Sequence, residues 1–176
     1  MYKQLITSLK TSLKTLSLAM VFISVSHAKE DTFQENININ SSRQAVDLKN
    51  KIASYIDNVV ITQGTLTIKA DLVQVMETGN NEEKTYLAKG NPATFEHQLE
   101  NGKPIYLQAN EIKYQPSQNI LTVTGNAELR GEGMQSKGGT IRYNFLTEQV
   151  CTNCTESDKN ERVSTVLQPN KLEKDK

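Results

Sequence analysis

The chain has 176 residues, of which 36% are hydrophobic, and its 20 basic residues balance its 20 acidic residues. It has no tryptophan and no basic stripe, which argues against a nucleic-acid-binding surface. Two histidines and two cysteines leave little material for a metal centre.

The N-terminus has the pattern of an export signal. Three lysines and no acidic residue precede a mostly apolar stretch at 16–25, which ends in small residues. This pattern predicts a secretory signal peptide over 1–28, cut between Ala28 and Lys29. An uncleaved membrane anchor is the alternative, but the uncharged run is shorter than the ~20 residues that a spanning helix needs. Both alternatives predict export.

The mature chain reads as one all-β domain. It keeps 17 basic and 20 acidic residues in 148 positions, a net charge of −3. Val, Ile, Thr and Tyr recur between Asn, Gly and Asp, a composition typical of strands and turns. We predict a flexible leader at 29–35, a single domain at 36–168 and a disordered charged tail at 169–176.

An eight-residue pattern repeats along this domain. Copies begin at Ile68, Leu107 and Ser136, and a weaker one at Ile39, so the spacings are 29, 39 and 29 residues. Apolar or small residues alternate with polar ones within each copy, as a half-buried strand requires. Repeats of one supersecondary unit predict an elongated, stacked β-structure that surrounds something, and argue against a compact catalytic domain.

Each full copy contains a predicted corner. The alternation flips after the third residue, and the next position is Asp71, Asn110 or Gly139, residue types that tolerate unusual backbone angles. An extra residue here re-aims the strand while the same face stays buried, as in a β-bulge. A second signal, found at 57–58, 90–92 and 125–126, predicts turns that lead into further strands.

The residues predict no catalytic site, no metal and no cofactor. His97 beside Glu96 is the single histidine of the mature chain, whereas a zinc site needs three or four convergent ligands. A serine nucleophile would lack a base, and the Gly-rich pairs have no strand-to-helix context that would make them phosphate loops. We therefore expect that the protein is not an enzyme.

Cys151 and Cys154 form a Cys-x-x-Cys pair. A thioredoxin-like redox role would need a helix N-terminus that lowers a thiol pKa, and strand sequences flank the pair instead. A β-turn brings its end Cα atoms within ~7 Å, inside the range that a disulfide bridges. We predict a local disulfide in the turn before the last strand, formed in an oxidising compartment.

Four segments of the domain resemble the LptA (OstA-like) family of periplasmic bridge proteins in lipopolysaccharide export. They are Val-Val-Ile-Thr-Gln-Gly-Thr-Leu-Thr-Ile-Lys-Ala-Asp at 59–71, Gly-Asn-Pro-Ala-Thr-Phe at 90–95, Asn-Gly-Lys-Pro at 101–104 and Leu-Thr-Val-Thr-Gly-Asn-Ala at 121–127. The resemblance implies a twisted, open-ended antiparallel β-jellyroll with a V-shaped section. It also implies a periplasmic protein that holds the acyl chains of lipid A inside.

The family resemblance extends to partners. It implies head-to-tail oligomers, an inner-membrane-anchored export partner at the N-terminal edge, and the N-terminal domain of the outer-membrane translocon at the C-terminal edge. The residues agree, because the first strand at 37–39 and the last at 163–167 carry no Pro or Lys to block pairing with another chain. The family is not associated with a Cys151–Cys154 pair, so the C-terminal contact is the part that departs from the pattern.

The inward-facing positions would form the lipid-binding lining. Taken alone, the same residues would equally form an ordinary sandwich core, and only the resemblance favours a lining. They are Ile37, Ile39, Val59, Ile61, Leu66, Ile68, Val73, Val75, Phe95, Leu107, Ile112, Tyr114, Leu121, Val123, Leu129, Ile141 and Tyr143.

Two other functions fit parts of the sequence. A secreted polysaccharide-binding β-solenoid would share the repeats, although the Tyr and Phe residues are too dispersed to form sugar platforms. An inner-membrane-anchored partner of the same fold would keep the N-terminal segment as its anchor.

Overall fold

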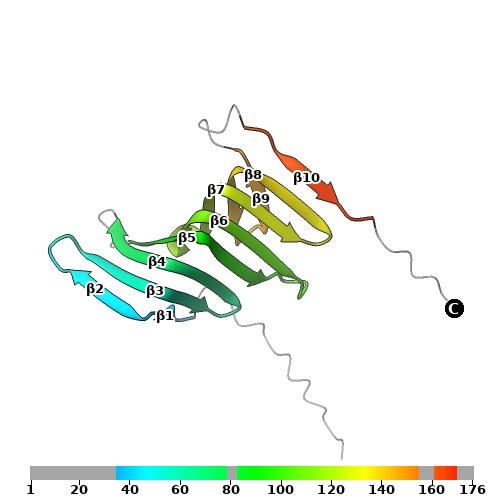
Figure 1. Cartoon of the computed structure of the whole chain (residues 1–176). Helices are drawn as coiled ribbons and strands as arrows, with labels where there is room; N and C mark the ends of the chain where they lie inside the picture. The colour runs from blue at the N-terminus through cyan, green and yellow to red at the C-terminus, as the bar shows by residue number, and fades with distance from the viewer. Residues whose placement is uncertain (1–34, 79–82, 155–160, 170–176) are drawn as a thin grey trace, which may run out of the picture.

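A single bent sheet makes up the structure, a computed structural model that describes residues 35–78, 83–154 and 161–169 (Figure 1). The predicted signal peptide with its Ala28–Lys29 cleavage site, almost all of the predicted leader, and tail residues 170–176 lie outside the described residues. The sheet contains β1 (Asn38–Asn40), β2 (Arg43–Asp47), β3 (Ile52–Gln63), β4 (Leu66–Thr78), β5 (Glu83–Gln98), β6 (Pro104–Gln115), β7 (Ile120–Gly131), β8 (Met134–Asn144), β9 (Gln149–Thr152) and β10 (Ser164–Leu167).

All neighbouring strands pair antiparallel, in the order β1-β3-β4-β5-β6-β7-β8-β10. β2 pairs with β3 beside β1, and β9 pairs with β8 beside β10, so each edge of the sheet is made of two short strands. Among the described residues the one helical turn is η2 (Pro116–Gln118), which links β6 to β7. This arrangement confirms the predicted all-β, antiparallel architecture.

A line of bulges crosses the sheet and bends it. Every pairing between the long strands β3 to β8 shifts register near mid-strand. We call this line the crease; it runs through 57–58 in β3, 70–71 in β4, 90–93 in β5, 109–110 in β6, 125–127 in β7 and Gly139 in β8. The predicted corners at Asp71, Asn110 and Gly139 all lie on it, which confirms them.

The crease shows that one group of predicted turns was wrong. The segments at 57–58, 90–92 and 125–126 were predicted to be turns between strands, but they lie inside β3, β5 and β7. Asp57, Asn58, Gly125 and Asn126 have positive φ, the backbone region that both turns and bulges use. The repeated pattern therefore marks alternate strands, β4, β6 and β8, and the intervening strands bend with different residues.

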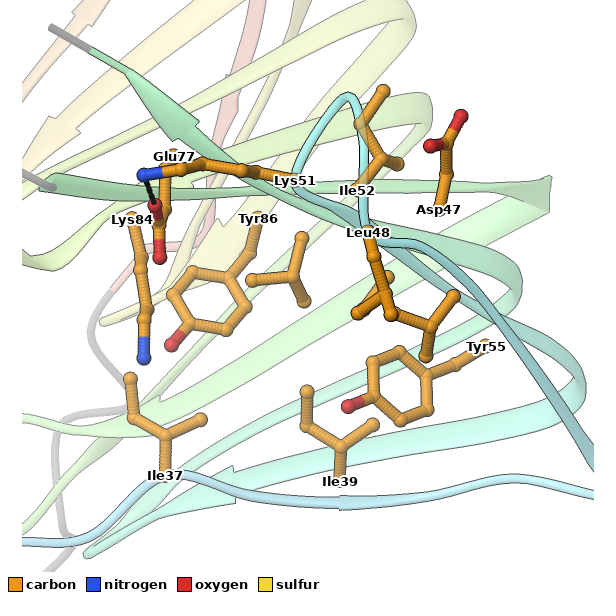
Figure 2. Close-up of a pocket in the computed structure, with 13 residues that line it drawn as sticks. Ile37, Ile39, Asp47, Leu48, Lys51, Ile52, Tyr55, Glu77, Lys84 and Tyr86 are labelled. Atoms are coloured by element: carbon orange, nitrogen blue, oxygen red, sulfur yellow. Dashed lines mark hydrogen bonds and ion pairs between the residues drawn. The ribbon is translucent and has the colours of Figure 1, made fainter.

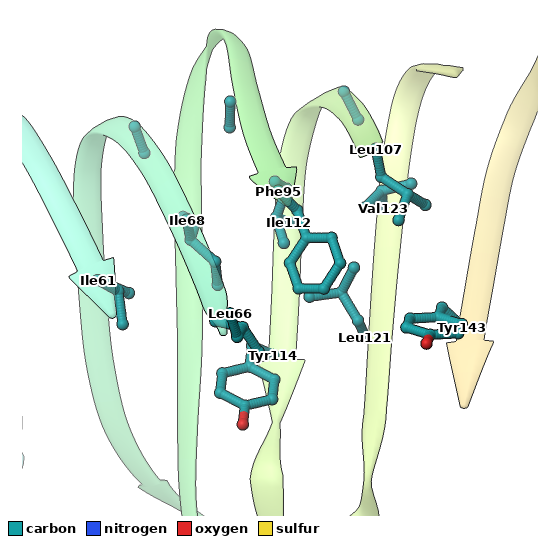
Figure 3. Packing of buried hydrophobic residues seen from close by; sticks show 14 of the residues in the cluster. Ile61, Leu66, Ile68, Phe95, Leu107, Ile112, Tyr114, Leu121, Val123 and Tyr143 are labelled. Carbon is teal, nitrogen blue, oxygen red and sulfur yellow. The ribbon is translucent and has the colours of Figure 1, made fainter. Parts of the chain in front are cut away.

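The crease divides the sheet into two facing walls. Wall A contains β2, β9, the first halves of β3, β5 and β7, and the second halves of β4, β6 and β8. Wall B contains β1, β10 and the other half of each long strand. The strands arch over at the crease, and the core side chains point into the space between the walls (Figure 3). This is the V-shaped section that was predicted.

Candidate functional site

An open groove lies between the walls at the N-terminal end of the sheet (Figure 2). Ile37 and Ile39 face it from the wall B side, and Tyr55 and Tyr86 face it from wall A. Val75 of wall A also lines it. The volume of the groove is ≈ 550 Å³. All five side chains belong to or pack on the hydrophobic core, so the groove is a continuation of the core that one side leaves uncovered.

Strand register aligns the inward residues of wall A in one row. The pairs connect Val46, Ala53, Val75, Tyr86, Tyr114, Leu121, Tyr143 and Val150 in turn. The row reaches from one edge of the sheet to the other without a charged residue. Because side chains alternate faces along a strand, a shift of one residue in any strand would break it.

Wall B carries a corresponding row. It connects Ile39, Ile61, Ile68, Phe95, Leu107, Leu129, Ser136 and Thr165. Six of these eight positions are apolar, and the two hydroxyl residues come last, at the C-terminal edge. Apolar surface therefore faces the interior along nearly the whole length of the sheet.

Aromatic side chains close the interior in its C-terminal half (Figure 3). Phe145, which follows β8 in wall A, packs on Phe95 of wall B with ring centroids 5.9 Å apart. It also packs on Tyr143 at 4.9 Å and Tyr114 at 5.5 Å. His97 of wall B lies 6.0 Å from Phe145 in an edge-on arrangement. This cluster fills the space that the groove leaves open at the other end.

Hydrogen bonds also join the two walls. The Tyr114 hydroxyl in wall A donates to Oε1 of Gln63 in wall B, and both side chains are buried. At the tips of the walls, the backbone N–H of Glu100 donates to Oε1 of Glu148 over 2.8 Å. Burial raises the pKa of Tyr114 well above the ordinary tyrosine value, so its hydroxyl stays protonated as a donor.

Charged residues lie at the rim of the groove. Lys51 forms an ion pair with Glu77, with Nζ and Oε2 2.9 Å apart, and Lys84 and Asp47 line the same rim (Figure 2). Hydrogen bonds from the backbone and side chain of Asn50 lower the pKa of the Asp47 carboxyl. The groove thus has an apolar floor and an exposed charged margin.

The seventeen predicted lining residues all face the interior. All but three are buried within the core; Ile37, Ile39 and Val75 are half-buried. Only these three line the groove. Contact with lipid stays a prediction for the whole set.

Sequence reasoning missed several interior residues. Tyr55 and Tyr86 line the groove, and Phe145 is the centre of the aromatic cluster. Tyr86-Leu87-Ala88 is a run of three apolar residues, so alternation does not distinguish Tyr86 and Ala88, which are buried, from Leu87, which is not. Phe145 lies beyond the end of β8, but it continues the apolar–polar alternation of Ile141 and Tyr143, and that period would have identified it.

His97 lies in the closed half of the interior. Its Nδ1 lies 3.2 Å from the Thr65 hydroxyl, and its ring packs in the aromatic cluster. In the described part of the chain, no three His, Cys, Asp or Glu side chains gather to hold a metal ion. His97 is therefore a buried core residue with a polar partner.

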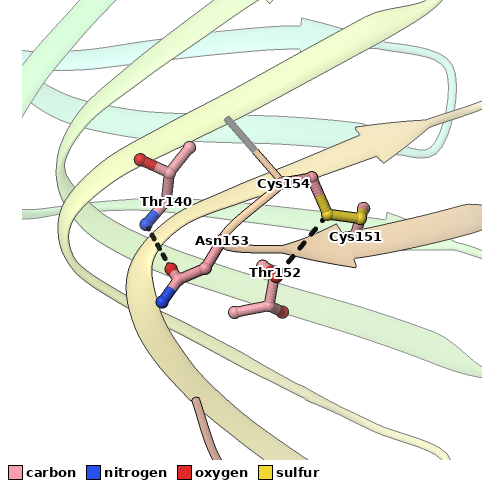
Figure 4. Close-up of a disulfide and its surroundings, with 5 residues drawn as sticks. All are labelled: Thr140, Cys151, Thr152, Asn153 and Cys154. Atoms are coloured by element: carbon pink, nitrogen blue, oxygen red, sulfur yellow. Dashed lines mark hydrogen bonds between the residues drawn. A yellow bond between two sulfur atoms is a disulfide. The ribbon is translucent and has the colours of Figure 1, made fainter. Parts of the chain in front are cut away.

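Cys151 and Cys154 are joined by a disulfide, with Cα atoms 5.9 Å apart (Figure 4). The sequence placed the pair in a turn directly before the last strand. Cys151 instead belongs to β9, a strand that the sequence did not predict, and it pairs opposite Arg142 of β8.

The fold and interior together define the class of protein: an open-ended antiparallel β-jellyroll with an apolar interior between two walls. The family described as "LptA/(LptD N-terminal domain) LPS transport protein" matches residues 38–149. The chain belongs to this family, as the resemblance predicted.

Relatives support this assignment. The lipopolysaccharide export system protein LptA of Haemophilus influenzae is 36% identical over 167 residues, covering 93% of this chain and 95% of that protein. The Escherichia coli K12 protein of the same name is 36% identical over 138 residues, covering 78% of this chain and 73% of its own length.

A solved structure has the same fold. LptH of Pseudomonas aeruginosa, described as the LptA-homologous periplasmic component of the lipopolysaccharide transport device, superposes with a TM-score of 0.70. The match is 22% identical and covers 78% of this chain and 99% of that one. This likeness favours the jellyroll over the β-solenoid that was the rival fold. No helix in the described ranges has the length and apolar character needed to cross a membrane.

Proposed function

We propose that this chain is a non-enzymatic carrier of lipopolysaccharide in the periplasm. It shields the acyl chains of lipid A between its walls and assembles head to tail, as a bridge from the inner-membrane export complex to the outer-membrane translocon. The observation that carries the proposal is the pair of inward rows, of which the wall A row is apolar from one edge of the sheet to the other and the wall B row is apolar up to Ser136 and Thr165.

The cost of exposing acyl chains to water explains why such rows are useful. A chain of about ten methylenes in water costs on the order of 8 kcal/mol relative to an apolar environment. A carrier therefore needs an uninterrupted apolar surface across the aqueous gap. The groove at Ile39 and Val75 offers the accessible part of that surface.

The rim of the groove suits an anionic headgroup. Lys51 and Lys84 place cationic side chains beside the apolar floor. A phosphate on lipid A would compete with Glu77 for Lys51, since the side chain of Lys51 is 62% exposed. Charged groups of the lipid stay in water at this margin while the acyl chains enter the groove.

Copies assemble when the edge strand of one pairs with the edge strand of the next. β1 and β2 leave their outer backbone groups without a described partner strand, as do β9 and β10. Because β1 and β2 run opposite to β9 and β10 across the sheet, a second copy can add its β1 to β10 and its β2 to β9 in antiparallel pairing. The inner-membrane partner would dock at the β1/β2 edge and the translocon domain at the β9/β10 edge.

Photocrosslinking in cells tests the lipid path. We expect a probe at Val75 to form lipopolysaccharide adducts, whereas a probe at Gln74, on the opposite face of β4, forms none. A second matched pair, Tyr114 and Lys113, reports on the closed half. Adducts at Val75 and Gln74 alike would indicate surface adsorption and contradict the carrier proposal.

Proline at the edge tests assembly. Ile39→Pro removes a backbone donor from β1, and we expect light scattering to show loss of oligomers while the circular dichroism spectrum is unchanged. Asn36→Pro, just before β1, is the control. An unchanged oligomer mass for Ile39→Pro would contradict strand addition.

N-terminal sequencing of the exported protein distinguishes a free carrier that begins at Lys29 from an anchored partner of the same fold.

A further inference from the structure

Asn153 sits on the crease of β8, between the two strands of the C-terminal edge (Figure 4). Its backbone N–H donates to the Thr140 carbonyl over 2.8 Å. Its side-chain Oδ1 accepts from the backbone N–H groups of Gly139 (2.9 Å) and Thr140 (3.2 Å), and its Nδ2 donates to the Glu161 carbonyl (3.1 Å). One side chain therefore satisfies the backbone groups that β9 and β10 leave unpaired at the crease.

We call Asn153 with these hydrogen bonds the cap. Two glycines of β8 leave space for it. A Cβ on Gly138 would lie 2.6 Å from Cγ2 of Thr152 and 2.7 Å from Oδ1 of Asn153. A Cβ on Gly139 would overlap the Glu161 carboxylate. Alanine at either position would push the segment away, so the cap and the crease of β8 fit each other closely.

The disulfide encloses the cap. Asn153 has φ of 54°, a left-handed conformation that a non-glycine residue holds at some cost. Cys151 and Cys154 flank the Thr152-Asn153 pair, and their covalent link limits the conformations open to it. Both cysteines are exposed, and β9 is only four residues long, so the disulfide and the hydrogen bonds of Asn153 hold this segment in place.

The capped edge accepts only certain partners. Because Asn153 and Glu161 occupy the crease, an incoming strand cannot pair continuously across it and must itself break there. The opposite edge of this chain breaks at the crease, where the Ser42 N–H donates to the Asp57 carbonyl over 3.0 Å between β1 and β2. A second copy thus presents the two-part edge that the cap demands.

The apolar rows indicate the register of this docking. The wall A row ends at Val150 on one edge and begins at Val46 on the other. The wall B row ends at Thr165 and begins at Ile39. Placing Val150 against Val46 of the next copy, and Thr165 against Ile39, continues both rows and keeps the crease of one copy in line with that of the next.

We propose that the disulfide-enclosed segment 151–154 is a specificity element for docking of a second copy. It holds Asn153 on the crease, presents β9 as a separate docking strand, and so selects an edge of the β1/β2 kind. This inference rests on the assembly part of the proposed function. It predicts that the Cys151–Cys154 link strengthens head-to-tail association without being needed for folding.

The test measures self-association of the mature chain by sedimentation velocity. We expect the Cys151→Ser, Cys154→Ser double variant to associate about tenfold more weakly than the oxidised wild type, because the cap loses several hydrogen bonds of modest net strength. A phosphine reductant should weaken the wild type to the same degree and leave the double variant unchanged. Asn153→Ala, which keeps the disulfide, should act in the same direction.

Asn101→Ala is the matched control, since Asn101 also accepts a backbone N–H bond but lies in the β5–β6 turn, away from both edges. Unaltered thermal unfolding of each variant shows that the fold is intact. Equal association of folded double variant and wild type would overturn the inference, as would free thiols at both positions in the exported protein. Failure of the oxidised wild type to associate at any concentration would instead contradict head-to-tail assembly itself.

Discussion

Inward apolar side chains alternate along the strands at both ends of the interior, but they line an open groove at one end and form a buried core at the other. At the N-terminal end, Ile39 and Val75 are half-buried and border an open groove. In the C-terminal half, Phe95 and Tyr143 are buried, with at most 1% of their surface exposed. Alternation alone gives each strand an inward face. Whether that face becomes a groove or a core depends on what the opposite wall places against it.

Cross-wall contacts account for the difference. The closed half has the Phe145 ring between the walls and the Tyr114–Gln63 hydrogen bond. At the groove, the first edge ends in exposed apolar residues instead: Val46 is 54% exposed and Leu48 is 85% exposed. Tyr86 marks the boundary, since it lines the groove and packs on Tyr114 with ring centroids 5.8 Å apart.

Removing the aromatic ring at the centre of the closed half should have the largest effect. Phe145→Ala deletes a side chain that is 4% exposed and contacts both walls, and we expect the free energy of unfolding to fall by about 3–5 kcal/mol. Urea denaturation measures the loss. Leu146→Ala, at a neighbour that is 77% exposed, is the control and should change stability little. A small loss for Phe145→Ala would mean that the two halves do not differ in packing.

The Tyr114 and Tyr143 hydroxyls allow a sharper comparison within the cluster. Tyr114→Phe removes the cross-wall hydrogen bond to the buried Gln63 side chain, and we expect a loss of about 1–3 kcal/mol. The Tyr143 hydroxyl is buried with no hydrogen-bond partner among the described residues. Tyr143→Phe should therefore be neutral or stabilising. Equal losses for the two variants would show that the cross-wall hydrogen bond contributes nothing specific.

A groove variant should affect ligand binding more than folding. Ile39→Ala removes half-buried apolar surface, with an expected cost to folding of about 1 kcal/mol. We expect binding of purified rough lipopolysaccharide, followed by fluorescence competition, to weaken severalfold. Asn38→Ala, on the outward face of the same strand, should leave binding unchanged. Similar binding by the two variants would remove the distinction between groove and outer face.

The smallest effect concerns alkaline pH. Burial, together with the nearby Glu148 charge, raises the pKa of Tyr143 above its ordinary value of 10.0. A raised folded-state pKa gives stability that is complete below pH 10 and is lost as the pH rises toward the folded-state value. Between pH 10 and 11, Tyr143→Phe should therefore lose less thermal stability than the wild type. Identical slopes in melting temperature against pH would contradict this.

The parity of the strands could be predicted because it is local. The change in apolar–polar alternation after Ala70 and Ala109 predicted both the corner and the buried face that follows it. The prediction of a turn between strands at Gly125-Asn126 was wrong, because the same residues supply positive φ in a hairpin turn and in a bulge inside a strand. Only the pairing partners on both sides distinguish the two.

The site was less accessible to prediction because it depends on long-range contacts. Alternation carried past the end of β8 shows that Phe145 turns inward while Leu146 points to solvent, but it does not show that the Phe145 ring meets Phe95 of the opposite wall. Nor does the sequence reveal that β9 would form around Cys151, since a four-residue strand exists only through its pairing with β8. All seventeen predicted lining residues face inward, their division into groove and core came from the structure, and their contact with lipid stays a prediction.

The strand count along the sheet determines how such a molecule can change its length. Eight strand levels make up the sheet, from β1 at one edge to β10 at the other, and neighbours alternate in direction. Because the number is even, a copy that is simply translated meets the next in antiparallel register, and the resulting fibre has two distinct ends. Adding or deleting one strand would reverse an outer edge, whereas adding a hairpin would preserve it. The repeat unit in the sequence, one strand out and one strand back, is therefore the smallest step by which this fold can grow.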